Sequence, residues 1–123
     1  PEKVLMVRRE FAQQREAEHT ALIASLIEAA AWCANPKNRA DLAQLMQRHA
    51  FPSLSFKLIE QSLASDDAPI FHGPELHRPA PAKASWLVDE MLRHGLLSEA
   101  AVAESSTQQA FRTDIYDAAL SAN

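Results

Sequence analysis

Apolar residues recur at helical spacing along most of this chain. The most apolar segment, TALIASLIEAAAWC at residues 20–33, carries apolar side chains around much of its circumference, which is typical of a helix at the centre of a core. Thr20 can cap its first turn. The stripe expected to face the core consists of Leu22, Ile23, Leu26, Ile27, Ala29, Ala30 and Cys33.

Capping residues divide the next part of the chain into two shorter helices. Asn35 followed by Pro36 marks a helix start, because Asn accepts from free N–H groups and proline is tolerated at the first helical position. This helix is expected to end near His49. Ser55 can cap the next helix, which the turn residues at 65–69 end. The predicted inward positions are Leu42, Leu45, Met46, Phe56, Ile59 and Leu63.

Residues 66–81 are the least regular part of the chain. They contain Pro69, Gly73, Pro74, Pro79 and Pro81. Prolines at this density block both a helix and a central strand. We expect an ordered crossing that packs Ile70 and Phe71 onto the core and positions Pro81 to start the next helix.

Helical periodicity returns after this crossing and continues to the end of the chain. Gly95 is placed for a left-handed cap that ends the first of these helices, while Ser98 and Thr113 mark the starts of two more. The predicted inward positions are Ala84, Leu87, Val88, Met91, Leu92, Ile115, Tyr116, Ala119 and Leu120.

The other end of the chain is less clearly helical. VLMV at residues 4–7 is typical of a short buried strand, and the residues after it favour a helix with Phe11 and Ala12 facing inward. The chain is therefore expected to be mainly α, with six or seven helices and at most one short strand near the N-terminus. We interpret residues 1–123 as a single helical domain or fragment.

Composition and charge exclude several classes of function. The net charge is -4 and the basic residues are scattered, so phosphate neutralisation does not favour nucleic acid as a direct partner. Only two glycines occur, which excludes a glycine-rich phosphate loop. No apolar run is long enough to insert in a membrane. Cys33 is the single cysteine, and we interpret it as a buried apolar thiol.

The stretch IFHGPELHRP contains the residues most like a metal site. His72, Glu75 and His77 are residue types that ligate zinc, but the two histidines are five apart across a Gly-Pro pair, whereas a helical zinc motif places them four apart. We interpret the stretch as a surface crossing. The histidines near predicted helix ends, which we expect to contact terminal backbone or solvent, are His19, His49 and His94.

The remaining candidates have simpler structural interpretations. Two carboxylate pairs, Asp66 with Asp67 and Asp114 with Asp117, are expected in turns or a first helical turn, where capping is favoured over acid–base chemistry. Trp32 and Trp86 could stack on a ligand, but each lies in an apolar run that favours core packing. Spacing alone therefore indicates no catalytic residue, no metal and no cofactor, and the chain is not expected to be an enzyme.

Four stretches in order give a wider resemblance. PEKVLMVRREFAQQ, HTALIASLIEAAAWCANPKNRADLAQLM, FH…RPAPAKASWLVDEMLRHGLL and QQAFRTDIYDAA together resemble the C-terminal portion of nitrate/bicarbonate-type solute-binding proteins of ABC transporters. The matching positions are Trp32, Cys33, Asn35, Pro36, Trp86, Met91, Arg93, Gly95, Phe111, Arg112, Asp114 and Tyr116. The segment between Leu63 and Ala82 looks shorter than in many members of that family.

The resemblance implies a fold and a function. The family fold is two α/β lobes that close on a small oxyanion, and this chain would be a helical C-terminal segment of it. The oxyanion pocket would lie upstream of Pro1, so no ligand-binding residue is assigned here. The absence of a starting Met or signal-like region is expected for a fragment or a trimmed chain. The implied partners are nitrate or a similar anion and the membrane components of an ABC transporter, in the periplasm.

Three alternatives stay open from the same resemblance. Some relatives lack a signal peptide, remain in the cytoplasm and sense nitrate by sequestering an RNA-binding antiterminator. A similar domain can also be fused behind a transporter ATPase. A helical interaction module that binds no ligand is the third alternative.

Overall fold

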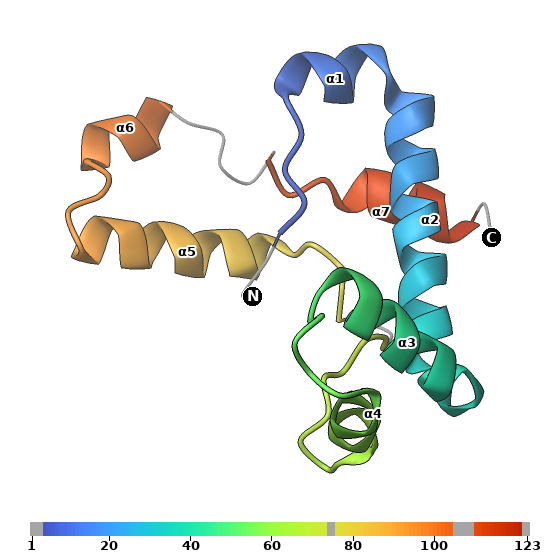
Figure 1. Ribbon diagram of the computed structural model, residues 1–123. Helices are drawn as coiled ribbons and strands as arrows, with labels where there is room; N and C mark the ends of the chain where they lie inside the picture. Colours follow the sequence, from blue (N-terminus) through green and yellow to red (C-terminus); the bar gives the residue numbers. More distant parts are fainter. Residues whose placement is uncertain (1–3, 74–75, 105–109, 122–123) are drawn as a thin grey trace. The chain divides into compact units, whose positions relative to one another are not determined.

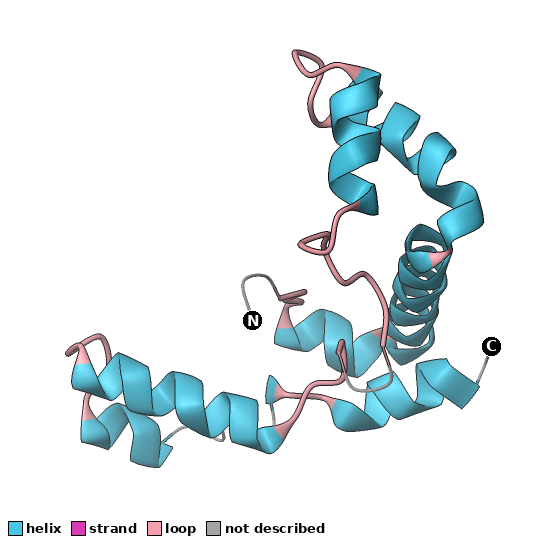
Figure 2. Cartoon of the chain, turned by 90° about the horizontal axis from the view of Figure 1, so that it is seen from below, coloured by secondary structure: helices cyan, strands magenta, loops and turns pink. Residues whose placement is uncertain are grey.

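All regular structure in the part of the chain that is described is helical (Figures 1 and 2). The computed structural model describes residues 4–73, 76–104 and 110–121. Its elements are α1 (Arg9–Gln14), α2 (Glu16–Ala34), the 3-10 helix η1 (Pro36–Asn38), α3 (Arg39–His49), α4 (Phe56–Ala64), α5 (Pro81–Arg93), α6 (Glu99–Glu104) and α7 (Thr113–Ser121). The mainly-α prediction is confirmed.

The predicted strand at residues 4–7 is wrong. These residues have no regular structure, and the side chains of Val4, Leu5 and Met6 are exposed. A strand needs a neighbour that pairs with its backbone N–H and C=O groups. The described ranges contain no second strand, so an apolar run of four residues has nothing to pair with.

The chain divides into two compact units. One consists of residues 1–24 and 78–123, and the other of residues 25–77. The first boundary falls within α2, and the second falls within the crossing of residues 66–81. Each unit has its own small set of buried residues.

The unit of residues 25–77 is built on the pair α3 and α4, which lie side by side in Figure 1. Its buried apolar side chains are Ile27, Leu42, Ala43 and Ile59. The turn between the two helices is fastened because Gln47 Nε2 donates to the Leu54 carbonyl at 3.0 Å. α3 ends at His49, as predicted.

Both predicted caps in this unit are confirmed. The Asn35 side chain accepts from the Lys37 N–H at 3.0 Å and starts η1, with Pro36 at its first position. Ser55 Oγ accepts from the Leu58 N–H at 3.3 Å and starts α4. Each cap satisfies an N–H that has no partner within its helix.

The buried side chains of the unit of residues 1–24 and 78–123 lie on α5 and α7, together with His19 on α2. The buried apolar residues of this unit are Ala84, Ile115, Tyr116 and Ala119. The segment before α5 is joined to α7 by two hydrogen bonds from the Arg78 guanidinium to the Asp117 carboxylate, at 2.7 and 3.2 Å. Lys83 Nζ also donates to the Arg78 carbonyl at 2.7 Å, which fixes the start of α5.

Gly95 ends α5 as predicted. Its φ of 66° is left-handed, the Gly95 N–H donates to the Leu92 carbonyl, and the Leu96 N–H donates to the Met91 carbonyl. These two bonds satisfy carbonyls that the last helical turn leaves free, which is the pattern of a Schellman cap.

The predicted role of α2 is wrong in two respects. The helix begins at Glu16, four residues earlier than predicted, so Thr20 lies inside it and does not cap it. Its alanines extend the helix in both directions because alanine has the highest helix propensity. Of the predicted stripe only Ile27 is buried, while Leu22 and Leu26 are exposed. A helix apolar all round needs neighbours on several sides, and the described elements of each unit cover only part of it.

Other predicted inward positions are also exposed. Leu45, Leu87 and Leu120 keep nearly half of their surface accessible. The predicted burial of Ala84 and Ala119 is confirmed, and Ala43 is buried although it was not predicted. Ala43 and Ala119 are fully buried and Ala84 nearly so, because alanine lets two backbones approach closely.

Among the described residues, no helix combines the length and the apolar character needed to cross a bilayer.

Candidate functional site

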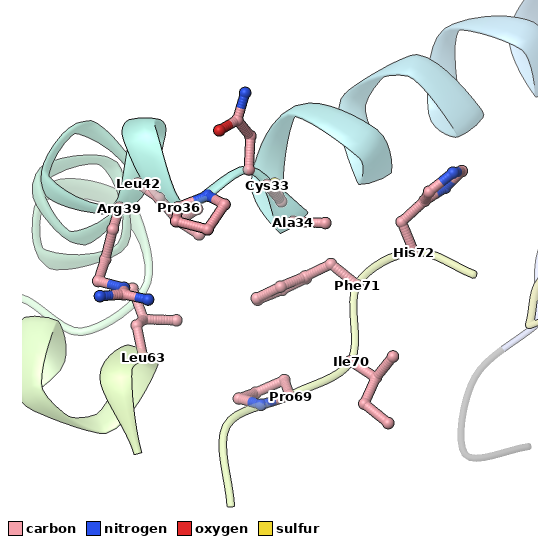
Figure 3. Close-up of a pocket in the computed structure, with 11 residues that line it drawn as sticks. Cys33, Ala34, Pro36, Arg39, Leu42, Leu63, Pro69, Ile70, Phe71 and His72 are labelled. Carbon is pink, nitrogen blue, oxygen red and sulfur yellow. The ribbon is translucent and has the colours of Figure 1, made fainter. Parts of the chain in front are cut away.

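A cavity of about 260 Å³ lies in the unit of residues 25–77 (Figure 3). It is half open to solvent and is bordered by the end of α2, the start of α3, the end of α4 and the crossing residues 69–72. Its lining residues are Cys33, Ala34, Asn35, Pro36, Arg39, Leu42, Leu63, Pro69, Ile70, Phe71 and His72.

The Asn-Pro turn brings one wall of this cavity together. Asn38 Nδ2 donates to the Trp32 carbonyl at 2.9 Å, so η1 folds back on the end of α2. As a result Cys33, from the last turn of α2, and Arg39, from the first turn of α3, line the same space. The sequence signal that predicted the helix boundary therefore also places these two side chains.

The crossing forms the opposite wall. The half-buried Phe71 ring extends toward the space between Arg39 and Leu63, whereas Ile70 turns the other way (Figure 3). Ile70 is 77% exposed, so the prediction that it packs onto the core is wrong. In an extended segment successive side chains point to opposite sides, so only one of this pair can face the helices.

His77 holds the crossing in a loop. Its Nε2 lies 2.5 Å from the Phe71 carbonyl oxygen, and because a carbonyl only accepts, the ring nitrogen donates. The His72 and His77 rings lie with their centroids 6.5 Å apart and tilted by 36°. His77 therefore closes the loop that presents Phe71 to the cavity, a role that spacing did not predict.

The charge of the cavity is positive. Arg39 is half-buried, and its guanidinium has no carboxylate partner among the described residues. The described lining residues include no Asp or Glu. The sequence alone did not single out Arg39, because an arginine in the first turn of a helix has no distinctive pattern. Its one sequence signal is its position directly after an Asn-Pro helix start.

The zinc-like triplet does not assemble within the described ranges. Glu75 lies outside the described residues, and His77 Nε2 is already engaged with the Phe71 carbonyl. Within these ranges, no group of three or more His, Cys, Asp or Glu side chains is arranged to hold a metal ion.

The three other histidines differ in environment. The side chain of His19, within α2, is buried edge-on to the Phe11 ring at 5.8 Å, and its Nδ1 has no hydrogen-bond partner among the described residues. The expectation of a solvent or terminal contact is wrong for His19, because α2 begins before it. His49 and His94 are exposed at the ends of α3 and α5, as predicted, and His94 Nε2 lies 3.7 Å from Glu90.

The two carboxylates of the predicted pair on α7, Asp114 and Asp117, each bind a different arginine. Asp114 accepts from the Arg112 guanidinium at 2.7 and 2.8 Å, and Asp117 pairs with Arg78 as described above. The hydrogen bond from Arg112 lowers the pKa of Asp114, and the same bond raises the pKa of Arg112. The two carboxylates therefore fasten α7 and do not form a catalytic pair. Asp66 and Asp67 are exposed in the turn after α4.

The two tryptophans lie at the surface of their helices. Trp32 and Trp86 are 38% and 56% exposed, so the prediction that both pack in the core is wrong. Each sits in an apolar run whose helix is only partly covered by its own unit. Neither lines the cavity.

Comparison with known proteins relates the chain to anion transport. Residues 1–47 match the sequence model of the NMT1-like family. The bicarbonate transport ATP-binding protein CmpC of Synechococcus elongatus is 32% identical over 100 residues, which cover 77% of this chain and 15% of that protein. The resemblance to the nitrate- and bicarbonate-transport family is confirmed.

Two further relatives carry similar names. The CmpC protein of Synechocystis is 28% identical over 106 residues, covering 77% of this chain and 16% of that protein. The nitrate import ATP-binding protein NrtC of Synechococcus elongatus is 25% identical over 132 residues, covering 99% of this chain and 20% of that protein. The chain thus spans a fifth or less of these relatives, which are named as ATP-binding components and not as solute-binding proteins. No solved structure is significantly similar to the chain.

Proposed function

We propose that this chain is a helical, solute-binding-protein-like segment of an ABC-type uptake system for nitrate, bicarbonate or a similar small oxyanion. The observation that carries the proposal is the 32% identity over 100 residues with a bicarbonate transport ATP-binding protein. The NMT1-like match over residues 1–47 supports it independently. In this role the chain is not an enzyme, and its partners are the anion and the membrane components of the transporter.

The segment has two possible attachments within such a system. In the first, it belongs to a solute receptor in the periplasm. In the second, it is linked to the ATP-binding component and works in the cytoplasm. The names of the relatives favour the second attachment, since three of them are ATP-binding proteins. The exposed apolar side chains on α2 and α5 fit either one, because each supplies further protein to cover them.

Uptake by cells that carry the complete protein tests the proposal. Deleting the segment that corresponds to residues 1–123 should lower uptake of labelled nitrate or bicarbonate, or remove its regulation by the cell's supply of that anion. A deletion that leaves both rate and regulation unchanged, with the protein still produced in normal amount, would contradict the proposal.

Protease accessibility then separates the two attachments. In spheroplasts, a protease added outside should cut a periplasmic segment and spare a cytoplasmic one until the membrane is opened. Protection in intact spheroplasts would support attachment to the ATP-binding component. Cleavage in intact spheroplasts would support the receptor.

A further inference from the structure

The cavity of Figure 3 combines one cationic end with an apolar body. We propose that it binds a small monocarboxylate that has an apolar group, with the carboxylate on Arg39 and the apolar group against Phe71 and Leu63. This goes beyond the transport of a hydrophilic oxyanion and does not depend on it.

Arg39 is the residue that selects for an anion. Its guanidinium is half-buried and has no carboxylate partner among the described residues, so a ligand carboxylate would supply the missing charge. A guanidinium presents two parallel N–H donors that match the two oxygens of a carboxylate. The described lining contains no acidic side chain that would repel the anion or compete with it.

The rest of the lining selects for an apolar body. Phe71 and Leu63 lie near the guanidinium, and the remaining apolar contributors are Ala34, Pro36, Leu42 and Pro69. Pockets for drug-sized ligands begin at about 300 Å³, so a cavity of about 260 Å³ suits a smaller molecule. A single aromatic ring with one carboxylate fits this description, and benzoate is a suitable probe.

Cys33 makes binding measurable without any activity. It lines the cavity and is the single cysteine of the chain, so a thiol reagent reports on this site alone. A ligand seated beside Cys33 should shield the thiol and slow its alkylation. The increase in mass per chain then gives the fraction labelled.

The experiment measures the rate at which N-ethylmaleimide labels Cys33 in the 123-residue chain, at constant ionic strength. A ligand of this size is expected to bind with a Kd on the order of 1 mM. Benzoate at about ten times that concentration should therefore slow labelling about tenfold. Benzyl alcohol keeps the aromatic ring without the carboxylate, whereas acetate and nitrate keep a negative charge without the ring. Each of the three should slow labelling less than about twofold at the same concentration.

Matched variants test the role assigned to Arg39. Arg39→Gln should weaken benzoate binding about tenfold, and Arg39→Lys should weaken it less because it keeps the charge. Arg48→Gln is the control. Arg48 lies on the same helix nine residues after Arg39, or two and a half turns, and is therefore on the opposite face of the helix. The Arg48→Gln substitution should leave protection by benzoate unchanged.

A third variant changes the volume of the cavity and leaves its charge unchanged. Leu63→Trp should fill the cavity and abolish protection by benzoate. Circular dichroism, together with the labelling rate without ligand, verifies that each variant keeps its fold.

Two results would overturn the proposal. One is that benzoate protects no better than acetate and benzyl alcohol do. The other is that folded Arg39→Gln and Leu63→Trp chains respond to benzoate as the parent chain does.

Discussion

His77 shows how a single exposed side chain can organise a loop. Its donation to the Phe71 carbonyl links two residues of a segment that has no regular structure. The neighbouring His72 is exposed and lies beside it, so the two histidines form a natural comparison. The sequence gives no reason to distinguish the two, whereas the structure shows a backbone hydrogen bond for His77.

We therefore expect His77→Ala to lower the free energy of unfolding by about 0.5–1 kcal/mol, the net value of one hydrogen bond near the surface. His72→Ala should change it by less than about 0.5 kcal/mol. Urea denaturation followed by circular dichroism measures both. Equal effects of the two substitutions would show that the His77 bond does not stabilise the loop.

Asp114 gives the chain a specific response to acid. Because the Arg112 guanidinium lowers the pKa of this carboxyl in the folded chain, the stabilisation is fully present above the ordinary Asp pKa of about 4. It is lost as the pH falls through the lowered value. Below a pH of about 4, the stability of Asp114→Asn should depend less steeply on pH than that of the parent chain.

Urea melts at a series of pH values measure that slope. Asp67→Asn is the matched control, since Asp67 is exposed and has no cation partner among the described residues. A slope that responds equally to both substitutions would rule out a distinct contribution from the Arg112 pair.

The ends of the helices are set by hydrogen bonds between residues that are close in sequence. Asn35, Ser55 and Gly95 each act through bonds to residues at most four positions away. Such bonds form whatever the rest of the chain does, which is why all three boundaries are as predicted. The faces of the same helices depend on distant neighbours, and several of those predictions are wrong.

The two glycines of the chain separate conformational cost from packing. A Cβ added at Gly95 meets no atom within 4 Å, so Gly95→Ala should destabilise through its left-handed φ alone, by about 1 kcal/mol. At Gly73 the backbone is not left-handed, and an added Cβ makes an ordinary 3.7 Å contact with Leu76. Gly73→Ala should therefore be neutral or slightly stabilising.

Thermal melts of the two alanine variants provide the comparison. If Gly73→Ala lowers the melting temperature as much as Gly95→Ala does, backbone conformation is not what gives Gly95 its role.

The chain as a whole offers little to a small hydrophilic anion. Among the described lining residues of the cavity, Arg39 alone carries a permanent positive charge, and its neighbours are mainly apolar. We therefore expect the 123-residue chain to bind nitrate, nitrite and bicarbonate with a Kd weaker than about 1 mM. Calorimetry that found micromolar binding would place an oxyanion site within this chain and contradict the expectation.

The surface of the chain exposes several large apolar side chains. Leu22, Leu26 and Trp32 are exposed on α2, which is apolar around much of its circumference, and Trp86 is exposed on the amphipathic helix α5. Those side chains match what the family resemblance implies, a helical segment that is built into a larger protein. The sequence matches to proteins at least five times longer are consistent with it.

The amino-acid order was sufficient for everything that depends on near neighbours. It predicted the helical class, the Asn35, Ser55 and Gly95 boundaries and the irregular crossing, because propensity, capping and proline act within a few residues. The family resemblance also came from the order of short motifs, without any knowledge of contacts.

Folding decided what depends on residues far apart in the chain. Which helix face is covered, why VLMV forms no strand, and why Ala43 is buried while Leu45 and Leu120 are exposed all require partners that no local pattern names. The cavity is the clearest case. Cys33, Arg39, Leu63 and Phe71 span 39 positions, and only the packing of α2, α3, α4 and the crossing places a thiol, a cation and an aromatic ring around one space.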